Sequence, residues 1–151
     1  MPSRHVSEVR IVVQTASRAA NIPSPARLRR WVRASVRTPA CLTLRIVSSN
    51  EARLLNRRFR NRDYPTNVLS FGYGPAQGRL KGDIVLCAPV VAKEARLQGK
   101  SLLAHYAHLT VHGVLHLRGW NHETGPEAAR MESLERRILA GLGFPDPYEQ
   151  G

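Results

Sequence analysis

Long hydrophobic runs, cysteines and acidic residues are all scarce in this sequence of 151 residues. No stretch approaches the roughly 18 apolar residues that a membrane-spanning helix needs. The first twenty residues contain only the short apolar run 11–13, which is too short for the core of a signal peptide. Two cysteines cannot form a disulfide framework, which favours a reducing compartment. We therefore expect a cytoplasmic protein without a membrane partner.

The length and composition are typical of one folded domain. A chain with 42% hydrophobic and 23% charged residues can bury a core of its own. No internal repeat and no low-complexity segment divides it. We therefore expect residues 1–151 to form a single domain.

Positive charge is concentrated in the first part of the chain. The sequence has 23 lysine and arginine residues against 11 acidic residues, a net charge of +12. Up to Tyr64 there are 14 arginines, no lysine and three acidic residues, whereas the remainder is nearly neutral. This asymmetry favours a polyanionic partner, and nucleic acid before an anionic membrane surface. Many of the individual arginines would still serve only as solvated surface charge.

The hydrophobic pattern predicts about four strands and about five helices that do not alternate strictly. Strands are expected at residues 8–13, 42–47, 68–71 and 83–86. Helices with recognisable capping patterns are expected at residues 24–39, 48–60, 89–98, 101–119 and 124–142. The glycine-rich segment 72–82 should be a mobile loop, and the tail from residue 144 should be extended. These elements indicate an α+β domain with one mixed sheet.

The histidines are clustered, since five of the six lie between residues 105 and 122. His112 and His116 are four residues apart, so on a helix their rings project from the same face. Gly119 can then end the helix in a left-handed conformation, which allows His122 to approach from the side. Three imidazole nitrogens would hold one zinc ion, or another divalent metal, and leave a fourth position for water. The pattern is therefore typical of a catalytic metal site.

Two further histidines compete for this role. His108 is also four residues from His112, but His108, His112 and His116 would span about 12 Å along a helix, too far for one ion. For His108 and for His105 we expect ordinary hydrogen bonds instead.

The spacing His-x-x-x-His-x-x-Gly-x-x-His is also that of the metzincin peptidases. In those enzymes a glutamate follows the first histidine and acts as general base, whereas Gly113 stands here and has no side chain to take a proton. A phosphodiester offers an anionic oxygen that a metal ion can bind, and the basic part of the chain would suit a phosphate backbone. The residues therefore favour phosphodiester over peptide hydrolysis.

Further motifs complete a family pattern. They are Phe59 with Arg60, Asp63, residues 65–71 (Pro-Thr-Asn-Val-Leu-Ser-Phe), residues 82–84 (Gly-Asp-Ile) and the run from Ala104 to His122. Together, over about residues 56–148, they resemble the YbeY endoribonucleases, also called rRNA maturation factors. The resemblance implies an α+β fold with the site in a cleft, and zinc-dependent cleavage of single-stranded RNA. It also implies roles in maturing the ribosomal RNA of the small subunit and in ribosome quality control.

By the same resemblance, His112, His116 and His122 are the metal ligands, and Arg60 is the functional arginine at the cleft. The sequence departs from the family at two positions. Asn121 stands where the family usually has an aspartate before its third histidine, which would change the metal affinity or its pH dependence. Gly72 stands where the family usually has a proline.

The mechanism expected from these parts is attack on a phosphodiester by hydroxide formed from zinc-bound water, with Arg60 stabilising the charge that develops on phosphorus. A ribose 2′-hydroxyl is an alternative attacking group. Weaker candidates for RNA contacts are Arg57, Arg58 and Arg62, which are equally typical of solvated surface, and Phe71, Tyr73, Tyr106 and Trp120, which are more typical of core. Two other functions stay open: a metallopeptidase-like hydrolase, and a non-catalytic ribosome assembly factor with a structural metal.

Overall fold

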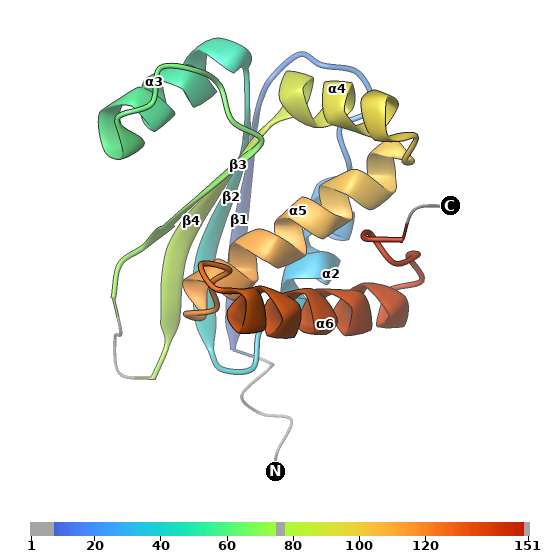
Figure 1. Ribbon diagram of the computed structural model, residues 1–151. Helices are drawn as coiled ribbons and strands as arrows, with labels where there is room; N and C mark the ends of the chain where they lie inside the picture. Colours follow the sequence, from blue (N-terminus) through green and yellow to red (C-terminus); the bar gives the residue numbers. More distant parts are fainter. Residues whose placement is uncertain (1–7, 75–77, 150–151) are drawn as a thin grey trace.

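The computed structural model describes residues 8–74 and 78–149, and within them the chain forms one four-stranded sheet and five helices (Figure 1). The elements follow in the order β1 (Val9–Ala16), α2 (Pro25–Ser35), β2 (Ala40–Val47), α3 (Ser49–Arg60), β3 (Val68–Gly72), β4 (Leu80–Cys87), α4 (Ala88–Gln98), α5 (Leu102–Leu117) and α6 (Gly125–Gly141). The strand order is β1-β2-β4-β3, with β1, β2 and β4 parallel and the edge strand β3 antiparallel to β4. The predicted α+β fold with one mixed sheet is confirmed.

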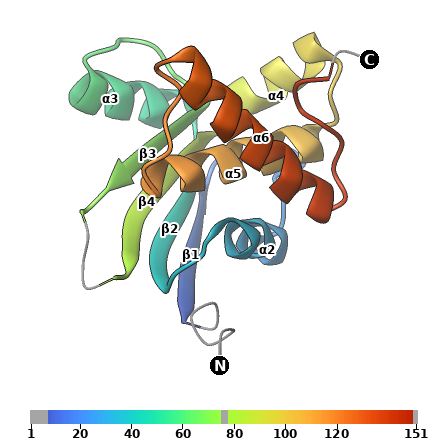
Figure 2. The same ribbon diagram turned by 60° about the horizontal axis from the view of Figure 1, so that its bottom comes forward.

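The sheet carries apolar side chains on both faces, and helices cover both. In β4, Ile84 and Leu86 belong to the larger core with α2, α5 and α6, whereas Val85 and Cys87 belong to a smaller core beneath α3. This alternation follows from the two-residue period of a strand. Figures 1 and 2 show α5 running across the sheet with α6 packed on its outer side. None of the described helices has the length and hydrophobicity needed to cross a membrane.

The helix ends lie close to their predicted positions because local capping determines them. The Ser48 side chain accepts a hydrogen bond from the backbone N–H of Glu51 at the start of α3, and the Ser101 side chain accepts one from Ala104 at the start of α5. Each such cap contributes about 1 kcal/mol. Asn61, in the left-handed region at φ 56°, ends α3. The first helix is shorter than predicted, because the chain is already extended after Ser35.

The glycine-rich segment 72–82 is less of a loop than predicted. Gly72 pairs with Gly82 in the β3–β4 ladder, which is flanked by a hydrogen bond from Tyr73 N to Lys81 O at 3.2 Å. A Cβ atom at Gly82 would lie 2.7 Å from Leu117 Cδ2 and 2.8 Å from Phe71 O, so close packing against α5 requires glycine here. Residues 75–77 of the predicted loop lie outside the described residues.

The C-terminal tail is also not extended as predicted. Glu149 N donates to Asp146 O at 3.3 Å, and Tyr148 N donates to the Asp146 side chain at 2.8 Å. This turn brings the Tyr148 ring back onto α5 and α6. The last two residues of the predicted tail, 150–151, and residues 1–7 lie outside the described part of the chain.

Candidate metal centre

Helix α5 and the turn after it bring the three predicted histidines together. His112 and His116 project from the last turns of α5, and Gly119 then adopts φ 95°. Trp120 N donates to Leu115 O at 3.0 Å, which closes the helix and returns the chain toward its own last turn. As a result, ligand nitrogens of His112, His116 and His122 all lie within 4.8 Å of one another.

The geometry of this histidine triad fits a divalent ion of the zinc type. The Nε2 atoms of His112 and His116 are 3.0 Å apart, close to the separation of about 3.4 Å expected between two nitrogens that bind one tetrahedral ion. Burial, together with the neighbouring rings of His112 and His122, lowers the pKa of His116 to about 4. The imidazole is therefore neutral at neutral pH, and its lone pair is available for a metal.

A buried carboxylate that the sequence analysis did not single out orients one of these rings. Glu135 on α6 has no exposed surface, and its Oε2 accepts a hydrogen bond from His112 Nδ1 at 2.6 Å. Because the proton is held on Nδ1, the lone pair of His112 lies on Nε2, the atom that faces His116. Glu135 thus determines both the tautomer and the direction of a candidate ligand.

Two other side chains share the same carboxylate. His108 Nε2 donates to Glu135 Oε1 at 2.9 Å, and the Tyr148 hydroxyl also donates to Glu135 Oε1. Burial alone would raise the pKa of Glu135, but these hydrogen bonds and the one from His112 lower it to about 2. Although His108, His112 and Glu135 could also surround an ion, both carboxylate oxygens already accept hydrogen bonds from the rings. We therefore regard this group as a hydrogen-bonded network that supports the triad.

The sequence did carry one signal for Glu135. It lies four residues after Met131 and four before Leu139, and all three residues are buried on one side of α6. A carboxyl group within an apolar stripe indicates a buried partner. The part played by Tyr148 had no comparable signal, because it depends on the turn of the tail.

His105 has a local hydrogen-bonding role, as predicted. Its Nε2 lies 2.9 Å from Glu94 Oε1, and Glu94 also accepts a hydrogen bond from Asn67 Nδ2 at 3.0 Å. His105 therefore stands outside the triad.

Arg60 reaches the same cavity as the triad. This cavity has a volume of about 510 Å³ and is lined by Arg60, Asn67, Val68, Leu69, Ser70, Gly72, His112, His116, Leu117 and His122. Arg60 comes from the last turn of α3, and its Nη2 donates to the backbone oxygen of Ser70 at 2.9 Å. A guanidinium from the first part of the chain and three imidazoles from the second part thus share one cleft.

Gly113 packs against the sheet and does not face the cavity. A Cβ atom at this position would lie 3.0 Å from Ile84 Cγ2 and 3.2 Å from Ser70 Oγ. The Ser70 hydroxyl donates to Gly113 O at 3.1 Å, which holds α5 close to β3. The position at which a metzincin carries its general base therefore faces the sheet in this protein and leaves no room for a longer side chain.

The remaining candidates are mostly outside the cavity. Asp63 forms an ion pair with Arg53, with Arg53 Nε 2.8 Å from Asp63 Oδ1. Asn121 accepts a hydrogen bond from Glu123 N at 3.4 Å, a local turn contact. The Tyr106 side chain is fully buried in the larger core, as expected for a structural aromatic residue.

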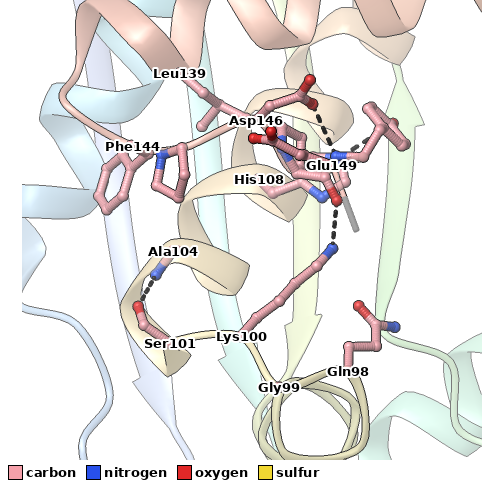
Figure 3. A pocket seen from close by; sticks show the side chains of 13 residues that line it. Gln98, Gly99, Lys100, Ser101, Ala104, His108, Leu139, Phe144, Asp146 and Glu149 are labelled. Atoms are coloured by element: carbon pink, nitrogen blue, oxygen red, sulfur yellow. Dashed lines mark hydrogen bonds between the residues drawn. The ribbon is translucent and has the colours of Figure 1, made fainter. Parts of the chain in front are cut away.

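A second cavity, of about 900 Å³, lies between the α4–α5 turn and the tail, and of the histidines in the cluster only His108 lines it (Figure 3). Lys100 crosses it and donates from Nζ to Pro147 O at 2.7 Å. Arg136 Nε donates a hydrogen bond to Asp146 Oδ2 at 3.0 Å. These contacts keep the tail in the turn that places Tyr148 on Glu135. The second cavity therefore lies beside the hydrogen-bonded network around Glu135 and does not reach the triad.

Replacing Glu135 should weaken metal binding without removing a ligand. We expect Glu135→Gln to lower the affinity for zinc by about 10- to 100-fold, because the amide no longer fixes the His112 tautomer. Competition with a chromogenic chelator measures this. Glu132→Gln is the matched control, since Glu132 lies on the same helix at the surface and only approaches Arg136 at 3.8 Å. Equal affinities for the two variants would contradict a role of Glu135 in holding His112.

Comparison with known proteins finds a family that matches most of this chain. The family model described as Endoribonuclease YbeY matches residues 12–143. The chain is 53% identical over 142 residues to the endoribonuclease YbeY of Thiobacillus denitrificans, covering 93% of this chain and 97% of that protein. It is 52% identical over 145 residues to the endoribonuclease YbeY of Aromatoleum aromaticum, covering 94% of each chain.

A solved structure shows the same fold at low sequence identity. The solution structure of a protein from Thermotoga maritima superposes with a TM-score of 0.53 at 19% identity, covering 93% of this chain and 99% of the other. The family model spans most of the chain, and the two relatives are identical to it at more than half of the aligned positions. The chain therefore belongs to the YbeY endoribonuclease family.

Proposed function

We propose that this protein is a zinc-dependent endoribonuclease that cuts single-stranded RNA in the cytoplasm, and that it acts in maturing the RNA of the small ribosomal subunit and in ribosome quality control. The observation that carries the proposal is one cavity lined by His112, His116 and His122, whose ligand nitrogens lie within 4.8 Å of one another, and by Arg60. Family membership supports RNA as the substrate class.

The three imidazoles would hold the ion, and His112 would be kept in place by Glu135. A zinc ion bound there supplies a Lewis acid for a phosphoryl oxygen and a water molecule of lowered pKa. The depressed pKa of His116, about 4, supports this role, since no proton has to leave that ring at neutral pH. The donor set consists of nitrogens alone, which suits zinc better than magnesium or calcium.

Arg60 would act on the phosphate. Its guanidinium lies at the same cavity, and one nitrogen, Nη2, is held by Ser70 O at 2.9 Å. The planar fork retains further N–H groups that can donate to two phosphoryl oxygens. Such donors stabilise the negative charge that grows as phosphorus becomes five-coordinate. Holding one edge of the guanidinium on the backbone reduces the reorganisation needed in the transition state.

The charge distribution supports RNA as the substrate, and the cysteines support a cytoplasmic location. The first part of the chain, with 14 arginines up to Tyr64, would attract an RNA backbone. Cys41 and Cys87 are both free, one exposed and one buried, which is compatible with a reducing cytoplasm. Peptide hydrolysis is disfavoured because Gly113 is packed against Ile84 and Ser70.

The proposal is tested by incubating the zinc-loaded protein with a short unpaired RNA, with its duplex and with an unfolded protein substrate. We expect cleavage of the unpaired RNA only, its loss with a chelator and its recovery with added zinc. Analysis of the ends identifies the attacking group: a linear phosphate indicates water, and a cyclic phosphate indicates the ribose 2′-hydroxyl. Proteolysis with intact RNA would favour a peptidase, and RNA binding without any cleavage would favour an assembly factor.

A further inference from the structure

Two adjacent aromatic rings, with one guanidinium group at each end of the pair, form a cluster beside the metal cavity. Phe59 and Phe71 meet edge to face, with ring centroids 5.3 Å apart and planes at 62°. Arg60 Cζ lies 5.1 Å from the centroid of Phe71, and Arg58 Cζ lies 5.4 Å from the centroid of Phe59. We call these four residues the aromatic step.

The aromatic step is joined to the cavity through the edge strand β3. Ser70 faces α5, as its bond to Gly113 O shows, so the next side chain, Phe71, lies on the opposite face, toward α3. Arg60 bridges the two faces, because it donates to Ser70 O and also lies over the ring of Phe71. β3 is the last strand of the sheet, so no further strand of the sheet lies between the triad and Phe59 at this edge.

Phe59 is not needed to complete the hydrophobic core. The smaller core ends with Leu55, Phe71 and Val90 as its partly buried members, and 53% of the Phe59 surface is exposed. A single exposed aromatic residue is ordinary. Phe59 differs from the other exposed apolar residues because arginines flank its ring pair and one of them, Arg60, lines the metal cavity.

We propose that Phe59, supported by Phe71 and flanked by Arg58 and Arg60, stacks against one unpaired base adjacent to the phosphate in the cavity. This inference rests on the proposed function. Any unpaired base can stack on an aromatic face, and the guanidinium groups at the two ends of the ring pair can bind the neighbouring phosphates. A base within a duplex is already stacked on both sides and cannot lie on Phe59. The aromatic step therefore provides a physical basis for selecting unpaired RNA.

The test compares the wild-type protein with Phe59→Leu, which keeps an apolar side chain but removes the aromatic face, and with Phe59→Trp, which keeps it. Binding to a short unpaired RNA is measured by fluorescence anisotropy in the zinc-loaded protein. We expect the leucine variant to bind about tenfold more weakly and the tryptophan variant to bind as well as wild type or better. Leu97→Ala is the control, because Leu97 is 77% exposed but lies on α4 and does not line the metal cavity.

A set of RNAs with one abasic residue at successive positions makes the test specific. At one position the missing base should weaken binding of the wild type by about the same factor as Phe59→Leu, and it should not weaken the leucine variant further. If the leucine variant and wild type bind intact RNA equally, or if no abasic position couples to Phe59, the stacking inference is wrong. The proposed function is judged separately by chelator-sensitive cleavage by the wild type, and its absence would overturn both.

Discussion

His116→Ala is expected to abolish metal binding and RNA cleavage together. His116 is the middle member of the triad, with its Nε2 3.0 Å from His112 Nε2, and alanine removes one of three ligands. The affinity for zinc should fall by more than the roughly 100-fold that loss of an outer hydrogen-bond partner costs. Metal content after dialysis and cleavage of a labelled unpaired RNA are the two measurements.

The control for this variant is His105→Gln. His105 lies on the same helix but outside the triad, and the amide of glutamine can replace its hydrogen bond to Glu94. It should retain bound zinc and cleavage. A His116→Ala protein that keeps a full equivalent of zinc, or that cleaves RNA at the wild-type rate, would refute the assignment of the triad as the catalytic metal site.

Arg60→Ala should separate metal binding from RNA cleavage, because it leaves the metal in place and removes a group that acts on the phosphate. Arg60 contributes no ligand atom to the triad, so the zinc content should remain that of the wild type. Cleavage should fall by about 100- to 1000-fold, as when one preorganised donor to a developing oxyanion is lost. Arg60→Lys should recover only part of the rate, because an ammonium group lacks the planar fork.

Arg57→Ala is the matched control for charge, because Arg57 belongs to the same last turn of α3 but does not line the cavity. It should lower RNA affinity slightly at low salt and leave the rate at saturating RNA unchanged. Arg60 also donates a hydrogen bond to Ser70 O, so its removal can lower stability as well as activity. The melting temperature of each variant is therefore compared with that of the wild type. Cleavage by Arg60→Ala at the wild-type rate would exclude Arg60 from the mechanism.

The parts of the site that could be predicted from the sequence are those determined by local geometry. His112 and His116 share a helix face because they are four residues apart, and Gly119 reverses the chain because glycine readily adopts φ 95°. The helix starts were recognisable for the same reason, since Ser48 and Ser101 bond to N–H groups only three residues away. These contacts need no information from the rest of the fold.

The parts that could not be predicted depend on contacts between distant segments. Glu135 becomes a partner of His112 only when α6 packs on α5, and Tyr148 joins them only when the tail turns back. β1 continues past residue 13 and β4 begins before residue 83, because pairing with β2 includes residues that lack a strong strand pattern, such as Gln14 and Lys81. Hydrophobic periodicity carries no information on such pairing.

The register of the edge strand determines which of its backbone N–H groups pair with β4. Asn67 O accepts from Cys87 N, and Tyr73 N donates to Lys81 O, so odd-numbered residues of this stretch direct their backbone groups to β4. The amide hydrogen of Gly72 therefore points away from the sheet. A pyrrolidine ring at that position would cost no ladder hydrogen bond, so glycine and proline are interchangeable there as far as the sheet is concerned.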